Sequence, residues 1–183
     1  MITPRLLVSG YKHEGLLGTP EMDPLTEQGA LQDAQLVEVL FDAVSRRLGW
    51  LLDLRMAFQL RMANTGLIIF EQVEGFGWAG KNTSAVRVAW PVDDSIPNAD
   101  EGQSTLKLLF YHDGETQVRA AGASFYTGDV AHLPETPPDY LADSDEVNTA
   151  GTASMDSPPT PRKSSTSPPS AAHRDPAPTR ARP

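Results

Sequence analysis

Three aspartates near the most apolar part of the chain are the first candidates for chemistry, because paired carboxylates can act as general acid and general base. They are Asp33, Asp42 and Asp53. Asp33 and Asp42 are nine residues apart, which on a helix leaves their side chains about half a turn out of phase. Asp53 and Arg55 would share one side of a strand, where an exposed ion pair contributes little to stability. We expect Asp33 and Asp42 to lie in water, and we assign no catalytic residue.

Histidine and cysteine offer little further chemistry. The chain has no cysteine, which excludes disulfides, thiolate ligands and cysteine nucleophiles. None of the four histidines has a partner at the spacing of a metal-binding motif such as H-E-x-x-H; they are His13, His112, His132 and His173. We therefore expect neither a metal nor a cofactor. The alternative is a small ligand-binding or hydrolytic domain that gathers His112 and the three aspartates around a cavity.

A glycine-rich stretch, Gly75 to Gly80, superficially resembles a phosphate-binding loop. Lys81 is followed by Asn82 and not by the Ser or Thr that such a loop requires. A bend or bulge beside an aromatic strand is the better interpretation. Exposed tryptophans are frequent hot spots of protein interfaces, so Trp78 is a candidate binding residue. Tyr126 is another, since it and Phe125 would face opposite sides of a strand.

Charge divides the chain into an acidic body and a basic end. The net charge of −9 combines −12 over residues 1–146 with +3 over residues 147–183. An acidic body argues against nucleic-acid binding, which needs cations facing phosphates. It suits a basic protein partner, since complementary fields speed encounter, although net charge also keeps a domain in solution. The candidate binding residues are Asp33, Asp42, Trp78, Tyr126 and Asp129.

No stretch predicts contact with a membrane. The N-terminal residues lack the apolar run of roughly 7–15 residues that a signal peptide needs. No apolar run approaches the roughly 20 residues of a membrane span. We expect a soluble cytoplasmic protein.

The region that would position these side chains runs from Leu31 to Trp78, which is the most apolar part of the chain. Between Thr26 and Leu48 the apolar spacing of three and four residues predicts a helix; the residues are Val37, Leu40, Phe41, Val44 and Leu48. Arg46, Arg47 and Gly49 suit the end of such a helix. The alternative is a pair of strands, with Val37, Val39 and Phe41 on one face.

Strands are predicted along the rest of the body. Apolar and polar residues alternate over 50–62, which favours a strand. Shorter β-rich runs predict strands at 6–8, 67–70, 76–78, 85–90 and 106–110, and residues 92–103 are predicted as an acidic loop. Asp113-Gly114 is typical of a tight turn, which predicts a hairpin with residues 116–126.

The composition changes after Leu133. Eleven of the 16 prolines lie between Pro134 and Pro183, together with many serines and threonines. Such a segment buries too little apolar surface to offset the entropy lost on ordering its backbone. The sequence therefore predicts one α+β domain over residues 1–139, with an antiparallel sheet and at least one amphipathic helix. Residues 140–183 are predicted to be a disordered tail.

The layout resembles that of small immunity-type proteins from bacterial polymorphic toxin systems. The residues that carry this resemblance are the stretch 36–49, the strand 67–73 with Gly75 to Trp78, and the run 124–130. It implies an α+β domain without catalytic activity that binds and blocks a partner protein. The leading hypothesis is therefore a non-enzymatic protein-binding module with an acidic surface and a basic partner. A third possibility is an accessory subunit that acts only through the edge of its sheet.

Overall fold

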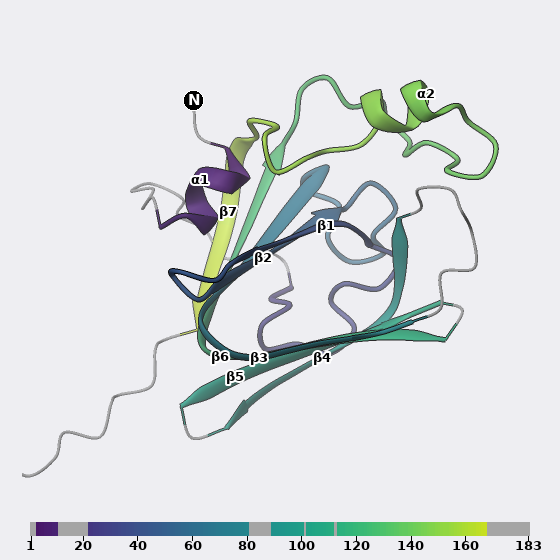
Figure 1. The fold of residues 1–183 in the computed structure, drawn as a ribbon. Helices are drawn as coiled ribbons and strands as arrows, with labels where there is room; N and C mark the ends of the chain where they lie inside the picture. Colours follow the sequence, from purple (N-terminus) through teal and green to yellow (C-terminus); the bar gives the residue numbers. More distant parts are fainter. Residues whose placement is uncertain (1–2, 11–21, 81–88, 101, 112, 168–183) are drawn as a thin grey trace, which may run out of the picture.

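The computed structural model contains one antiparallel sheet that closes on itself (Figure 1). The structure describes residues 3–10, 22–80, 89–100, 102–111 and 113–167. Its elements are α1 (Pro4–Val8), β1 (Gln35–Asp42), β2 (Arg47–Asp53), β3 (Thr65–Ala79), β4 (Trp90–Asp100), β5 (Gln103–Phe110), β6 (Gly114–Asp129), α2 (Asp145–Ala150) and β7 (Thr160–Ser167). The strand order is β3-β2-β1-β4-β5-β6-β7, and β3 also pairs with β6. The first six strands thus form a ring, with β7 added to β6 outside it.

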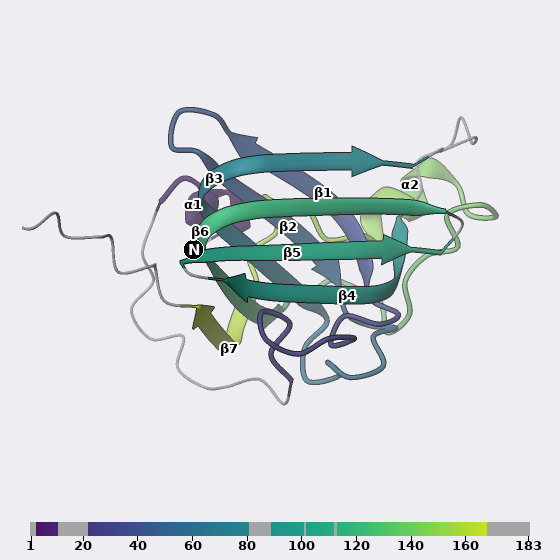
Figure 2. The same ribbon diagram turned by 90° about the horizontal axis from the view of Figure 1, so that it is seen from below.

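Two long strands, β3 and β6, belong to both halves of this ring. They pair along their whole lengths, from Thr65 opposite Gly128 to Ala79 opposite Glu115. The first part of β3 also pairs with β2, and the first part of β6 with β5. A bulge in β3 between Val73 and Gly75, next to Gln72 at φ 55°, marks where the strand passes from one half to the other. Figure 2 shows the half in which β3, β6, β5 and β4 lie side by side.

The main core lies inside the ring. Its largest fully buried side chains include Trp50, Phe70 and Phe125. The rings of Trp50 and Phe70 meet edge to face, with centroids 4.9 Å apart, an arrangement that aromatic pairs favour. Alternate residues of β2 and β3 point inward, so burial within the ring holds their register.

A second apolar cluster lies on the outer face of β2, β3 and the end of β6. Leu51, Leu67 and Ile69 from the strands pack there against Val8 of α1 and Met155 from the C-terminal segment. The close approach requires a glycine on β2, because a Cβ on Gly49 would lie 2.5 Å from Cγ2 of Val8. Strand β2 is therefore buried on both faces, which explains its nearly continuous apolar sequence.

The predicted amphipathic helix between Thr26 and Leu48 is wrong. Those residues form β1, a turn and the start of β2, so the two-strand alternative is the observed structure. Asp42 stabilises the turn by accepting hydrogen bonds from the backbone N–H groups of Val44 and Ser45, and Arg46 adopts φ 51°. Among the described residues the helices are α1 and α2, of five and six residues.

Several smaller predictions also need correction. Residues 6–8 belong to α1 instead of a strand, and 92–103 lie mostly in β4 instead of an acidic loop. The strand predicted over 50–62 stops at Asp53, and residues 54–64 form turns. Of the strand predicted over 85–90, residues 85–88 lie outside the described residues.

The antiparallel sheet itself is confirmed, as is the hairpin at Asp113-Gly114. Strand β5 pairs with β6 in register from Ser104 opposite Ala120 to Phe110 opposite Gly114. Asp113 adopts φ 64°, a left-handed conformation that Asp tolerates better than most residues. The bulge at the glycine-rich stretch is confirmed as well.

The segment after Asp139 corrects the predicted domain boundary. Residues 140–167 contain α2 and β7, and β7 pairs with β6. Ala153 and Met155 are buried against the outer face of the sheet. Pro158 and Pro159 precede β7 and Pro161 lies near its start, so they do not prevent these few apolar side chains from packing. The last part of the predicted tail, residues 168–183, lies outside the described residues.

Candidate functional site

The three aspartates considered for acid–base chemistry do not form one site. Asp33 accepts a hydrogen bond from the Tyr111 hydroxyl at 3.0 Å, and this bond raises the pKa of Tyr111. Asp33 lies just before β1, and Asp53 is opposite Gln35, the first residue of that strand. Asp42 is the last residue of β1, at its other end. Eight residues of strand separate the two ends by roughly 24 Å. His112 lies outside the described residues.

The other candidate binding residues lie on different parts of the molecule. Trp78 is partly exposed and packs edge to face on Trp90, with centroids 5.0 Å apart. Tyr126 is half-buried and packs against the outer apolar cluster. Asp129, at the end of β6, lines a pocket.

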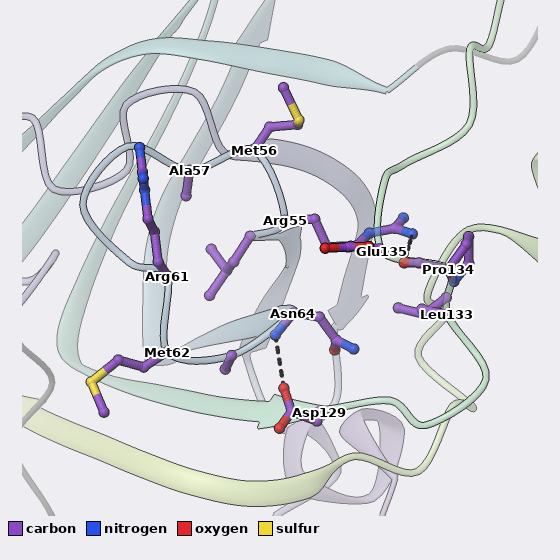
Figure 3. Close-up of a pocket in the computed structure, with 12 residues that line it drawn as sticks. Arg55, Met56, Ala57, Arg61, Met62, Asn64, Asp129, Leu133, Pro134 and Glu135 are labelled. Carbon is purple, nitrogen blue, oxygen red and sulfur yellow. Dashed lines mark hydrogen bonds between the residues drawn. The ribbon is translucent and has the colours of Figure 1, made fainter.

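That pocket has a volume of about 690 Å³ and opens between residues 54–64, called here the 54–64 loop, and the residues that follow β6 (Figure 3). The loop contributes Met56, Arg61 and Met62 to its lining. From the other side come Asp129, Leu133, Pro134 and Glu135.

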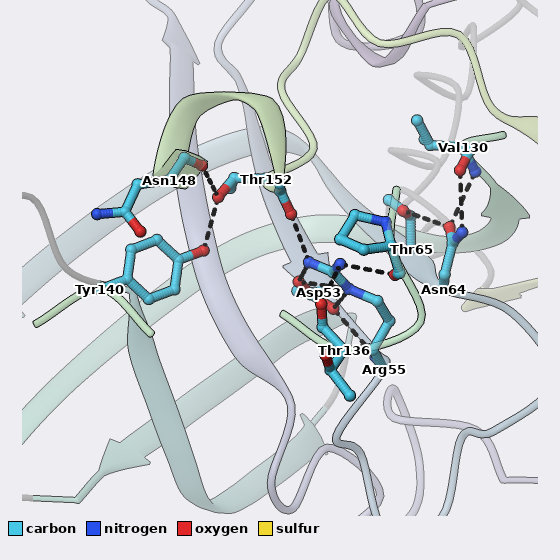
Figure 4. A network of polar contacts seen from close by, with 11 residues as sticks. Asp53, Arg55, Asn64, Thr65, Val130, Thr136, Tyr140, Asn148 and Thr152 are labelled. Atoms are coloured by element: carbon cyan, nitrogen blue, oxygen red, sulfur yellow. Dashed lines mark hydrogen bonds and ion pairs between the residues drawn. The ribbon is translucent and has the colours of Figure 1, made fainter. Parts of the chain in front are cut away.

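Hydrogen bonds connect the two walls of the pocket and fix their positions. The backbone N–H of Asn64 donates to Asp129 Oδ1 at 3.0 Å. The Asn64 side chain donates to the carbonyl oxygen of Val130 at 3.0 Å and accepts from the Val130 N–H at 2.9 Å (Figure 4). A single asparagine thus fixes the start of β3 to the end of β6.

A buried ion pair fixes the base of the 54–64 loop. Arg55 and Asp53 have side chains 3% and 1% exposed, and the guanidinium contacts both carboxylate oxygens. The same guanidinium donates to the carbonyl oxygens of Pro134, Thr136 and Gly151 at 2.7–3.1 Å (Figure 4). Arg55 is therefore neutralised, and it ties the segment after β6 to the loop.

The 54–64 loop presents apolar side chains to water around this fixed base. Met56 and Phe58 are 54% and 56% exposed, and Met62 is 37% exposed. The guanidinium of Arg61 lies over the Phe58 ring, 5.7 Å from its centroid, a favourable cation–π contact. Figure 3 shows Met56 and Met62 at opposite ends of the pocket lining. Three apolar side chains held exposed on one short loop are typical of an interaction surface.

Carboxylates dominate the segment on the other side of the pocket. Residues 129–146 hold six acidic side chains and no lysine or arginine; they are Asp129, Glu135, Asp139, Asp143, Asp145 and Glu146. Asp139 and Asp143 lie in a turn that carries the exposed Leu141. Of these six, Asp129 and Glu135 line the pocket, and Arg61 lines it as well.

Within the described ranges, no three His, Cys, Asp or Glu residues come together as a metal site would require. The same ranges contain no helix of the length and apolar character needed to cross a membrane. The arrangement offers an adaptable apolar rim, fixed walls and negative charge, which are features of binding.

Among the predicted binding residues, Asp129 lines this pocket, and sequence reasoning did not predict the loop beside it. The alternation of Met56, Phe58, Leu60 and Met62 predicted a strand with these residues on a buried face. Leu60 is indeed buried, but the other three project from turns. The absence of β-branched residues from this stretch was the signal against a strand.

No protein-family model matches the chain, and no curated protein matches its sequence. Among solved structures, the chain is similar to a crystal structure of an uncharacterized protein from Neisseria gonorrhoeae. The two are 13% identical, with a TM-score of 0.41, over 54% of this chain and 94% of that one.

Proposed function

We propose that this protein is a non-enzymatic binding module that acts in the cytoplasm and takes up a basic partner protein at the 54–64 loop. The observation that carries the proposal is the exposure of Met56, Phe58 and Met62 around a pocket with fixed walls. Methionine side chains are flexible and polarizable, so they adapt to partner surfaces. A buried aromatic contributes much of the binding energy where it fills a partner's pocket, and Phe58 is placed to do so.

The charge around the pocket supports a basic partner. Asp129 and Glu135 line the pocket, and four further carboxylates follow in residues 136–146. In such an arrangement the apolar residues supply affinity and the charges steer the encounter. Arg55 does not offset them because Asp53 already neutralises it. In an immunity-type role the module would bind a basic toxin and block its active surface.

Affinity capture followed by measurement on a purified pair tests this proposal. Full-length protein is used to capture partners from lysate of the source cell, and the purified basic partner is then titrated by calorimetry. Phe58→Ala is expected to weaken binding by about tenfold or more, as loss of a hot-spot aromatic does.

The chain offers a matched control. Phe41 on β1 is 50% exposed, close to the 56% of Phe58, and lies outside the 54–64 loop. Phe41→Ala is expected to leave the dissociation constant unchanged. Binding should also weaken as salt rises, because mobile ions screen the carboxylates. Equal affinities for the two alanine variants, or a partner without excess positive charge, would contradict the proposal.

A further inference from the structure

The outer part of β3 is an open strand edge. Residues Gly75 to Ala79 pair with β6 on one side, and within the described part of the chain they have no strand on the other. In Figure 2, β3 is accordingly the outermost strand of its half of the sheet. Alternate residues of such an edge turn backbone N–H and C=O groups outward, where another strand can pair with them.

This edge lacks the lysines and prolines that often prevent pairing. Strand β3 has 15 residues and contains no lysine, arginine or proline. Its charges are Glu71 and Glu74, which form ion pairs with Arg47 and Arg119. The strand at the opposite side of this half, β4, contains Pro91 and Pro97 with Asp93 and Asp94, all of which discourage edge pairing.

The two faces of the edge differ in a way that suits a neighbouring strand. Phe76 and Trp78 share the inner face with buried partners on β6, yet they remain 43% and 39% exposed. The other face carries only Gly75, Gly77 and Ala79. A Cβ added to Gly77 would meet no atom within 4 Å, so nothing on that face obstructs an incoming backbone.

We propose that the β3 edge pairs with the β3 edge of a second copy of this chain, antiparallel and centred on Gly77. A two-fold axis perpendicular to the sheet relates the copies, as in most homodimers. In this register Phe76 lies opposite Trp78 of the second copy, and the contact occurs twice. Glu74 lies opposite Gly80, so no carboxylates face each other across the junction. The β3-β6-β5-β4 parts of the two copies then form one continuous sheet.

Trp78 is already held in position for this contact. Its ring packs on Trp90 and on Phe110, with centroids 5.0 Å and 5.3 Å away. Little side-chain entropy is therefore lost when the aromatic pair forms. Because the paired strand segment is short, the dimer is expected to be weak and to dissociate on dilution.

A charge exchange at Gly77 tests the register. Gly77→Lys places two cations directly opposite each other at the two-fold axis, and Gly77→Glu places two anions there. Like charges in this position oppose association. Each variant alone is expected to raise the dimer dissociation constant of the full-length protein by about tenfold or more, measured by sedimentation velocity. An equimolar mixture should recover the dimer, because opposite charges then meet.

Gln117→Lys is the matched control, since Gln117 lies opposite Gly77 on β6 and on the same face of the sheet. The two substituted side chains would stand three strand spacings apart in the dimer, roughly 14 Å, which exceeds the screening length of about 8 Å at physiological salt. This variant should dimerise like the unmodified protein. A protein that stays monomeric up to about 1 mM, or a dimer unaffected by both Gly77 variants, would overturn the proposal.

Discussion

At the scale of single residues, the structure turns one predicted binding residue into a structural one. Asp42 accepts hydrogen bonds from the Ser45 hydroxyl at 2.7 Å and from the Ser45 N–H at 3.3 Å. The hydroxyl bond is the main reason why the pKa of Asp42 lies below its usual value of 3.8. A carboxylate that accepts such bonds is more stable ionised than protonated. The tight turn between β1 and β2 therefore depends on the charged form.

The pH dependence of Asp42 follows from this direction. A folded-state pKa below the unfolded value contributes stability that is present above the unfolded pKa and is lost as pH falls through the folded pKa. Ser45→Ala removes the hydroxyl donor, so the pKa of Asp42 should rise towards 3.8. NMR titration of the Asp42 carboxyl carbon checks this. The variant should also lose stability at pH 6 and differ less from the unmodified protein at pH 2; an unchanged pKa would contradict the assignment.

At the scale of elements, Arg55 links the turns after β2 to the segment after β6. One buried guanidinium satisfies the Asp53 carboxylate and three backbone carbonyl groups from residues 134–151. Removing one partner of a buried ion pair leaves the other charged and unpaired, which is costlier than losing the attraction alone.

Substitution of Arg55 should therefore destabilise the whole fold. Arg55→Ala is expected to lower the free energy of unfolding by about 3–5 kcal/mol, measured by urea denaturation. Arg55→Lys should recover part of this loss, since lysine keeps the charge but cannot form the planar fork. Lys107→Ala, which breaks the partly exposed pair with Glu115, should cost less than about 1 kcal/mol. If Arg55→Ala and Lys107→Ala lowered the free energy of unfolding equally, Arg55 would not be holding the two segments together.

Sequence patterns were sufficient for elements whose signals are local. The β5–β6 hairpin follows from a turn dipeptide flanked by alternating residues, and the structure contains it. The helix prediction failed between residues 35 and 53, although the spacing of Val37, Leu40 and Phe41 fits a helix. Val37 and Leu40 instead pack on the outer apolar cluster, while Phe41 is half exposed. A strand covered on both faces is too continuously apolar to show a period of two, and the covering residues, Val8 and Met155, lie far from these strands in sequence.

The candidate site could be predicted only in part for the same reason. Asp129 and the acidic character of residues 129–146 are visible in the sequence. The pocket depends on bonds between Asn64 and Val130 and between Arg55 and Gly151. Such long-range pairings leave no local pattern. Met56 and Phe58 are exposed because β2 ends before them, and the periodicity of the sequence does not show where a strand ends.

At the scale of the whole molecule, the C-terminal segment completes the fold. Ala153 and Met155 cover apolar residues of β2 and β3, and Arg5 of α1 donates its backbone N–H to the Met155 carbonyl at 2.8 Å. Strand β7 extends the sheet beyond β6. The segment is thus part of the domain, despite a composition that is typical of linkers.

Truncation distinguishes a folded segment from a dispensable tail. A chain that ends at Asp139 should lose at least about 2 kcal/mol of stability, since burial of Met155 alone contributes about that much. Its outer apolar cluster should also bind the dye ANS. A chain that ends at Ser167 keeps every described element and should match the full-length protein in both measurements. Identical urea midpoints for all three chains would refute the structural role of residues 140–167.

The dependence of the outer apolar cluster on Met155 also matters for a chain that is still being synthesised. Strands β1, β2 and β3 leave the ribosome first, and Leu67 and Ile69 then wait for a cover encoded much later in the message. At translation rates of about 5–20 residues per second, that wait lasts roughly 5–15 seconds. Every new molecule therefore passes through a period in which Val8 of α1 is present but Met155 is not yet there to complete the cover of Leu67 and Ile69.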